Sequence, residues 1–248
     1  MVMNLDLLRQ RIKVLESDYH CPQTPLPLGI VALDEALPDK GLARGEIHEI
    51  IAGHLPSALG FCAIIAGKLT QNHGPVLWCL PQDNICPQGL STFGLDPEKV
   101  FFAPFNSQKD GLWAVEEGLK TPGLSTVIAE GLSFSLATSR RLHLASRKYG
   151  VTALLLLTEG KKCTTHNVAA TRWRISSQPS TDAPSFLHYQ GIGNIRLLVE
   201  LLRAKRGTAP HSWLLEWNEQ NQCLNISERN ELVTAKTGSN KVQRILNA

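Results

Sequence analysis

Three consecutive segments decide the fold of this chain: Gly45-Glu-Ile-His-Glu-Ile-Ile51, then Ala52-Gly-His-Leu-Pro-Ser-Ala-Leu-Gly60, then Phe61-Cys-Ala-Ile-Ile-Ala-Gly-Lys-Leu69. Their composition predicts a short buried strand, a turn containing two glycines and an apolar helix. This order is typical of a phosphate-binding loop, G-x-x-x-x-G-K-[ST]. In that loop backbone N–H groups surround the phosphates, the lysine reaches the β and γ oxygens, and the hydroxyl holds Mg²⁺.

The residues that would bind phosphate are missing from this turn. Counting from Gly53, the last three places of the motif hold Ala58, Leu59 and Gly60, which offer neither an ammonium group nor a hydroxyl. Lys68 does not replace the lysine, because it lies eight positions beyond Gly60, about 12 Å along a helix. The sequence therefore predicts the framework of a nucleotide-binding domain without its phosphate chemistry.

Further strands and helices alternate along the chain. Apolar strands are predicted at residues 45–51, 76–80, 100–103, 125–130 and 151–157, with helices at 58–71, 90–93, 109–120 and 135–149 between them. This alternation favours a parallel sheet covered on both faces. Strands at 172–177, 195–202 and 213–217 follow without helices and are expected to be antiparallel. The predicted fold class is α/β: a mostly parallel central sheet, helices on both faces, and antiparallel strands added at the C-terminal side.

Four regions are expected along the 248 residues. Residues 1–20 contain an amphipathic helix that either packs on the core or contacts a partner. The apolar face of this helix comprises Leu5, Leu8, Ile12 and Leu15. Residues 21–27 form a Pro-rich linker, residues 28–217 the core domain, and residues 218–248 a polar, partly disordered tail.

Composition sets limits on location and cofactors. Hydrophobic residues make up 43% of the chain, the formal net charge is +3, and no apolar run is long enough to cross a membrane. The N-terminus mixes acids and bases too early for a secretory signal. The six cysteines contain no C-x-x-C pair, and the histidines show no H-x-x-x-H or H-x-E arrangement. We therefore expect a cytoplasmic protein without a metal, a cofactor or a membrane partner.

Nine short motifs occur in order between residues 27 and 217. They are PLGIVALD (27–34), GLARGEIHE (41–49), GPVLW (74–78), LWAVEE (112–117), ATSRRL (137–142), GVTALLL (150–156), AATRWR (169–174), VELLRA (199–204) and WLLEW (213–217). In this order they resemble the ImuA family, whose members are RecA-like accessory factors of bacterial damage-induced mutagenesis. No motif is diagnostic by itself, but nine in sequence make the resemblance fairly specific.

The resemblance implies a RecA-like adaptor in SOS-induced error-prone translesion synthesis. Family members are encoded with ImuB, a catalytically inactive Y-family polymerase relative, and with an error-prone replicative-type polymerase. ImuB is therefore the expected direct partner and the replicative-type polymerase an indirect one. RecA and weakly bound single-stranded DNA are further candidates. The expected location is the cytoplasm, with association with the nucleoid under DNA damage.

The resemblance also identifies the position of a catalytic carboxylate. In a RecA-like ATPase, a carboxylate just after the second strand positions the attacking water. Pro81 or Gln82 falls at that place in this chain, and neither acts as a base. Asp83 is close but displaced by one or two residues. Neither ATP hydrolysis nor another catalytic activity is expected.

Glu130 corresponds to the acid that ends the fourth strand and would hold Mg²⁺ in an active family relative. Without a hydroxyl near Leu59 or Gly60 it lacks a partner for the metal, and we expect it to bond a neighbouring helix N-terminus. The relic nucleotide site comprises Gly53, Ala58, Leu59, Gly60 and Glu130.

Basic side chains supply candidate DNA contacts. In RecA-like recombinases the loop after the fifth strand contacts single-stranded DNA, and here that loop contains Lys161 and Lys162. Arg172 and Arg174 flank Trp173, but a strand directs Trp173 to the opposite side, into the core. Lys161, Lys162, Arg172 and Arg174 are therefore the candidates. Binding through a few phosphates is expected to be weak and to fall steeply with salt.

Two other interpretations stay open. A cell-division inhibitor related to SulA is also a degenerate RecA-like protein and binds FtsZ, although such chains are usually shorter. A RecA-like ATPase with an unconventional phosphate-binding loop would bind nucleotide without the missing lysine. The ordered match through Trp217 favours the ImuA family over SulA.

Overall fold

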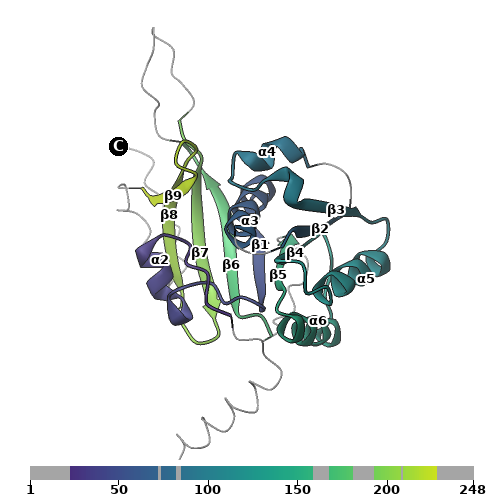
Figure 1. The fold of residues 1–248 in the computed structure, drawn as a ribbon. Helices are drawn as coiled ribbons and strands as arrows, with labels where there is room; N and C mark the ends of the chain where they lie inside the picture. The colour runs from purple at the N-terminus through teal and green to yellow at the C-terminus, as the bar shows by residue number, and fades with distance from the viewer. Residues whose placement is uncertain are drawn as a thin grey trace, which may run out of the picture.

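The computed structural model describes residues 23–71, 74–81, 85–158, 168–180, 193–207 and 209–227. Helices and strands alternate as far as β5, and strands alone follow (Figure 1). The helical elements are α2 (Val31–Ala36), η1 (Pro38–Lys40), α3 (Leu55–Thr70), α4 (Pro87–Ser91), η2 (Pro97–Lys99), α5 (Gln108–Leu119) and α6 (Leu136–Tyr149). The strands are β1 (Ile47–Ala52), β2 (Val76–Leu80), β3 (Val100–Pro104), β4 (Thr126–Glu130), β5 (Thr152–Thr158), β6 (Thr171–Gln178), β7 (Arg196–Ala204), β8 (His211–Asn218) and β9 (Cys223–Ile226).

Within the described residues, nine strands form one sheet in the order β3-β2-β4-β5-β1-β6-β7-β8-β9. The pairs from β3 through β6 are all parallel. The pairs from β6 through β9 are antiparallel. The predicted fold class, a mostly parallel sheet with antiparallel strands added at the C-terminal side, is confirmed.

Strand β6 differs from the prediction, which made it antiparallel. It pairs in parallel with β1, with His48 opposite Thr171 and Ala52 opposite Ile175, and it is antiparallel only to β7. Buried and half-buried residues alternate along β6. Such alternation indicates that one face is covered and carries no information on strand direction. The chain therefore leaves β5 at the carboxyl edge of the sheet and enters β6 at the amino edge.

One face of the sheet packs against α2 and α3. Phe61 of α3, Trp78 of β2 and Trp173 of β6 are all buried there, and the ring centroids of Phe61 and Trp173 lie 6.0 Å apart. Trp213 of β8 continues this aromatic row, with its ring centroid 6.4 Å from that of Trp173. Trp173 is thus a core residue, as its place in the strand predicts.

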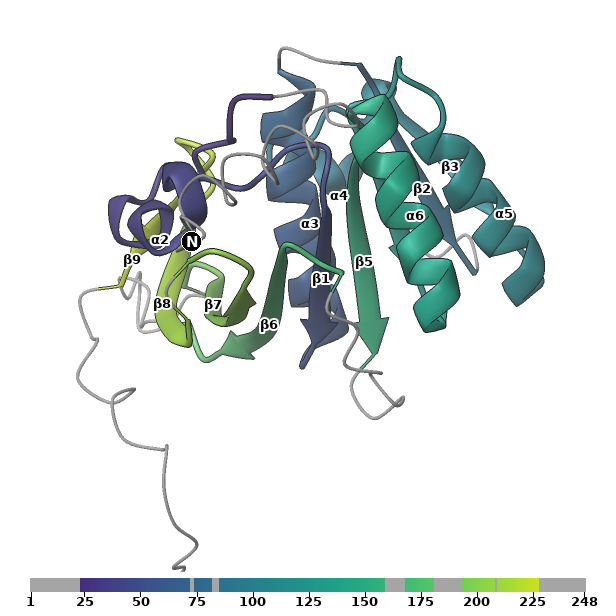
Figure 2. The ribbon, with the colours of Figure 1, turned by 90° about the horizontal axis from the view of Figure 1, so that it is seen from below.

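The other face of the parallel strands packs against α5 and α6, which lie side by side (Figure 2). Val115 of α5 and Leu142 of α6 are fully buried against the sheet. Each helix begins at a serine cap, Ser107 or Ser135, whose hydroxyl accepts a hydrogen bond from the N–H three residues further on. In the part of the chain that the structure describes, no helix is long and apolar enough to cross a membrane.

The ordered core extends beyond the predicted boundaries at both ends. Leu26, in the predicted linker, forms a β-bridge with Leu42 through two hydrogen bonds of 2.8 Å. Strand β9, in the predicted tail, adds the last strand of the sheet. The predicted N-terminal helix with Leu5, Leu8, Ile12 and Leu15 lies outside the described residues, as do Lys161, Lys162, Gln82 and Asp83.

Candidate functional site

The turn between β1 and α3 is much shorter than the sequence predicts. Only Gly53 and His54 separate the end of β1 from the start of α3. Positions 58 to 60, expected in the turn, lie instead in the first turns of the helix, with Ala58 and Gly60 buried. Pro56 stands at the helix start, where its missing N–H is not needed. The prediction of a turn over residues 52–60 is therefore wrong, because α3 begins at Leu55, six residues before Phe61.

The backbone N–H groups of this turn, those of Gly53 and His54, donate hydrogen bonds within the chain. The Ile175 carbonyl of β6 accepts hydrogen bonds from the N–H of Gly53 at 2.9 Å and of His54 at 3.2 Å. The N–H of Ala58 donates to the His54 carbonyl at 3.1 Å. A Cβ on Gly53 would collide with the Ser176 hydroxyl, so β6 lies directly against the turn. Both N–H groups of the two-residue turn, those of Gly53 and His54, thus donate to a neighbouring strand.

Glu130 is buried at the carboxyl end of β4, with 4% of its surface exposed. Its Oε2 has no hydrogen-bond partner, and neither oxygen bonds a helix N-terminus in the described part of the chain, so that expectation is wrong. Burial raises the pKa of this carboxyl, while the nearby Trp78 indole N–H partly offsets the rise. The two groups are close without an aligned hydrogen bond, because the indole nitrogen is also unpartnered. Burial, and then the Glu130 charge, raise the pKa of the Cys62 thiol of α3.

Replacing Glu130 with glutamine is expected to stabilise the protein at pH 7 and to have little effect near pH 4. The raised pKa means that the folded protein keeps this proton to a higher pH than the unfolded chain does. The wild type therefore loses stability as pH rises above the ordinary carboxyl range. Urea unfolding of both proteins at pH 4, 5.5 and 7 measures the difference, and a difference that does not grow with pH would contradict the assignment.

Lys68 and Pro81, which the sequence excludes from phosphate chemistry, lie apart from the turn. Lys68 is in the last turn of α3, where its Nζ approaches Gly29. Pro81 packs against Gly131, directly after Glu130. The described residues at this edge of the sheet therefore place no ammonium group beside Gly53.

The two arginines predicted to contact DNA form ion pairs on the sheet instead. Arg172 Nε donates to Glu49 Oε2 of β1 at 2.6 Å, and both side chains are mostly buried. Arg174 Nη1 lies 3.8 Å from Glu200 Oε2 of β7. These guanidinium groups are oriented by carboxylates of neighbouring strands, and Trp173 between them is buried. The structure therefore does not bring them together as a base-stacking platform.

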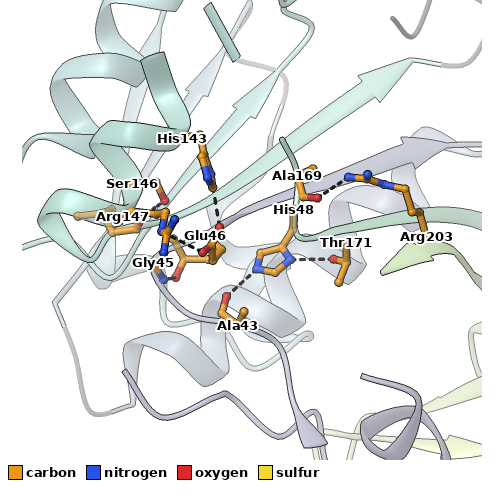
Figure 3. Close-up of polar contacts among 12 residues, drawn as sticks. Ala43, Gly45, Glu46, His48, His143, Ser146, Arg147, Ala169, Thr171 and Arg203 are labelled. Carbon is orange, nitrogen blue, oxygen red and sulfur yellow. Dashed lines mark hydrogen bonds and ion pairs between the residues drawn. The ribbon is translucent and has the colours of Figure 1, made fainter. Parts of the chain in front are cut away.

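A buried hydrogen-bond chain links β1 and β6 at the amino edge of the sheet, and sequence reasoning missed it (Figure 3). The Trp173 indole N–H donates to Thr171 Oγ1 at 2.7 Å, and the Thr171 hydroxyl lies 2.7 Å from His48 Nδ1. His48 Nε2 lies 2.7 Å from the Ala43 carbonyl. Since that carbonyl only accepts, the network assigns the proton to Nε2 and makes Nδ1 the acceptor. Complete burial lowers the pKa of His48 to about 4, although its bond to Ala43 favours the charged form.

Glu46 organises a second polar group at the same edge. Its carboxylate lies 3.4 Å from His143 Nδ1 and 3.4 Å from Arg147 Nε, both on α6 (Figure 3). The neighbouring Gly45 N–H donates to Thr152 Oγ1 at 3.1 Å. Gly45 has a φ of +66° and lies against Gly150, which a side chain would disturb. These contacts fix the chain that enters β1. Among the described residues, no three His, Cys, Asp or Glu side chains gather to hold a metal ion.

Comparison with a solved structure identifies the fold. The crystal structure of the RadB recombinase matches this chain with a TM-score of 0.56, at 13% identity, over 82% of this chain and 100% of that chain. An identity this low shows the fold alone, and the fold is RecA-like.

Two known sequences are similar over most of the length: Protein ImuA of Caulobacter vibrioides strain NA1000 / CB15N, and Protein ImuA of strain ATCC 19089 / CIP 103742 / CB 15. Each is 27% identical over 219 residues, covering 83% of this chain and 88% of the relative. No protein-family model matches the chain. The similarity supports assignment to the ImuA family, which the sequence motifs suggest independently.

Proposed function

We propose that this chain is a non-hydrolysing accessory protein of SOS-induced error-prone translesion synthesis. The similarity to ImuA sequences and the RecA-like fold support a RecA-like accessory role in damage-induced mutagenesis. In this role the fold serves as a rigid platform, and partner proteins bind its surfaces. The protein acts in the cytoplasm and associates with the nucleoid when DNA is damaged.

One observation carries the proposal that ATP is not hydrolysed: the Ile175 carbonyl accepts both N–H groups of the β1–α3 turn. A bound phosphate needs those donors, and an anion does not compete well for groups already bonded inside the fold. The lysine and hydroxyl of the motif are also absent from the sequence. Burial raises the pKa of Glu130, the acid at the Mg²⁺ position, so the charged form that would bind a metal is less favourable there than on an exposed carboxyl.

A nucleotide titration tests this part of the proposal. A fluorescent ATP analogue with Mg²⁺ is expected to give no saturable signal, and Mg-ATP at about 1 mM is expected to leave the melting temperature unchanged, because only a ligand bound to the folded state shifts it. An active RecA recombinase in the same titration is the positive control. Micromolar binding that disappears in Glu130→Ala would contradict the proposal and favour an ATPase with an unconventional loop.

The expected direct partner is an ImuB-type Y-family polymerase relative. The error-prone replicative-type polymerase is an indirect partner, which associates with this chain through the ImuB-type protein. RecA is a further candidate. Purified full-length chain, mixed separately with the ImuB-type protein and with FtsZ, is expected to capture the former. The variant Leu8→Glu/Ile12→Glu tests the predicted N-terminal helix, and Gln10→Glu/Ser17→Glu, on its polar side, is the control with the same change in charge. Capture of FtsZ alone would replace this proposal with the division-inhibitor interpretation.

A further inference from the structure

Four chain segments meet at the amino edge of the sheet, around the ends of β1, β6, β7 and α6. Thr171 at the start of β6 stands opposite Ala204 at the end of β7, and the Lys205 N–H donates to the Ala170 carbonyl at 2.8 Å. The segment before β1 crosses this edge and lies against Gly150, which caps α6. In Figure 1, α6 and the β7–β8 turn both lie at the lower side of the molecule.

This edge collects basic residues, and we call it the basic edge. Its lysines and arginines are Lys40, Arg44, Arg147, Lys148, Arg172, Arg203, Lys205 and Arg206. The carboxylates on the same segments are Asp34, Glu35, Asp39, Glu46 and Glu49. Eight basic and five acidic side chains give these segments a net charge of +3, equal to the formal net charge of the whole chain.

Two of the five acids are neutralised within the fold, which leaves exposed cations around them. Glu46 pairs with Arg147, and Arg203 donates to the Ala169 carbonyl (Figure 3). Glu49 pairs with Arg172. Lys40, Lys148 and Lys205 are exposed residues, and Lys148 Nζ lies 5.3 Å from the centre of the Tyr149 ring. Anions can reach these lysines without breaking an ion pair among the described residues.

An unusual backbone turn holds Lys40 at this edge. Asp39 and Lys40 adopt positive φ values of 56° and 58°, in a region that non-glycine residues rarely occupy. The turn cannot relax outward easily, because Gly41 lies directly against the Leu26 backbone. Gly207 of the β7–β8 turn packs against Pro38 and the Ala36 carbonyl, so Lys40 and Lys205 come from adjoining turns. Strain of this kind persists where the surroundings impose it, and it commonly marks functional surfaces.

We propose that the basic edge binds the phosphate backbone of duplex nucleic acid without reading its bases. The exposed large hydrophobic side chains nearest this edge, Val31 of α2 and Leu144 of α6, come from helices on opposite faces of the sheet, so they do not form one apolar anchor for a protein partner. The exposed aromatic residues of the described chain, Phe101 and Trp113, lie on β3 and α5. A single strand gains affinity by stacking bases on such rings. Without aromatic rings at this edge, the higher phosphate charge density of a duplex favours duplex over single-stranded nucleic acid.

This surface does not include Lys161 and Lys162 of the loop after β5, which the family resemblance assigns to single-stranded DNA and which lie outside the described residues. The inference goes beyond the adaptor role and does not depend on it, because a binding assay with DNA alone contains no partner protein.

The experiment measures fluorescence anisotropy of a labelled 30-base-pair duplex, and of one of its strands, with full-length protein between about 25 and 200 mM salt. The variant Lys40→Gln/Lys148→Gln/Lys205→Gln removes the three exposed ammonium groups. Its matched control, Lys109→Gln/Arg140→Gln/Arg141→Gln, removes three exposed charges of α5 and α6 away from this edge and lowers the net charge equally. Circular dichroism verifies that both variants fold.

The edge variant is expected to lose about tenfold or more in duplex affinity at low salt, and the slope of log K against log salt is expected to fall by about 2–3. The control is expected to stay within about threefold of the wild type. Equal losses in both variants, an unchanged edge variant, absence of duplex binding at the lowest salt, or tighter binding of the single strand would each overturn the proposal.

Discussion

Replacing Arg172 by methionine is expected to destabilise the protein by about 3–5 kcal/mol, because the Glu49 carboxylate is then buried without its partner. The two side chains keep only 13% and 7% of their surface exposed, and Nε lies 2.6 Å from Oε2. Their strands are adjacent at the centre of the sheet, so water cannot easily replace the guanidinium group. Urea unfolding followed by circular dichroism at pH 7 measures the loss.

The double variant Glu49→Leu/Arg172→Met distinguishes the stability contributed by the ion pair from the cost of leaving one buried charge without its partner. Removing both partners is expected to recover most of the stability, since a buried ion pair contributes little compared with apolar residues of similar size. Arg141→Met is the surface control, because Arg141 pairs with Glu116 while 59% of its side chain is exposed. If Arg172→Met unfolds at the same urea concentration as Arg141→Met, the buried pair does not have the assigned role.

Lowering the pH from 7 to below 4 is expected to remove about 3 kcal/mol of stability through His48. The folded protein holds the pKa of this residue at about 4 because the ring is fully buried. The unfolded chain takes up the proton near pH 6.5. Stability from the neutral ring is therefore complete above pH 6.5 and is lost as pH falls toward 4. The sign is opposite to that of Glu130, whose raised pKa weakens the fold as pH rises.

His48→Gln isolates this contribution, because glutamine does not titrate in the range. The variant starts less stable, since it loses part of the hydrogen-bond chain to Thr171 and Ala43. Its stability is expected to change less than that of the wild type between pH 7 and 4. Denaturation midpoints at four pH values give both curves. Parallel curves would show that His48 does not carry the acid sensitivity.

The sequence predicts the alternating elements of the fold because apolar strands and amphipathic helices leave periodic patterns. It fails at the start of α3, where the motif template places a loop. Pro56 at the helix start and Ala58 within it are as compatible with a helix as with a loop. Only the position of β6 decides between a loop and a helix over these residues. The direction of β6 is also hidden, because alternation of buried residues is the same in parallel and antiparallel strands.

The site itself is less predictable than the fold. The strand-end position of Glu130 can be read from the pattern, but the acceptor of the Gly53 and His54 N–H groups is a main-chain carbonyl. Any residue at position 175 supplies that carbonyl, so it leaves no sequence signal. His48 and Thr171 are 123 residues apart, and they meet only because β1 and β6 are parallel neighbours.

The hydrogen bonds from Gly53 and His54 to Ile175 also affect how the protein unfolds. They tie the first turn of α3 to the strand at which the parallel half of the sheet passes into the antiparallel half. Neither half can open locally there without leaving two backbone donors or one acceptor unsatisfied. The β1–α3 turn and strands β6 to β8 therefore belong to one cooperative unit of unfolding. A platform built in this way presents its surfaces in fixed positions relative to one another.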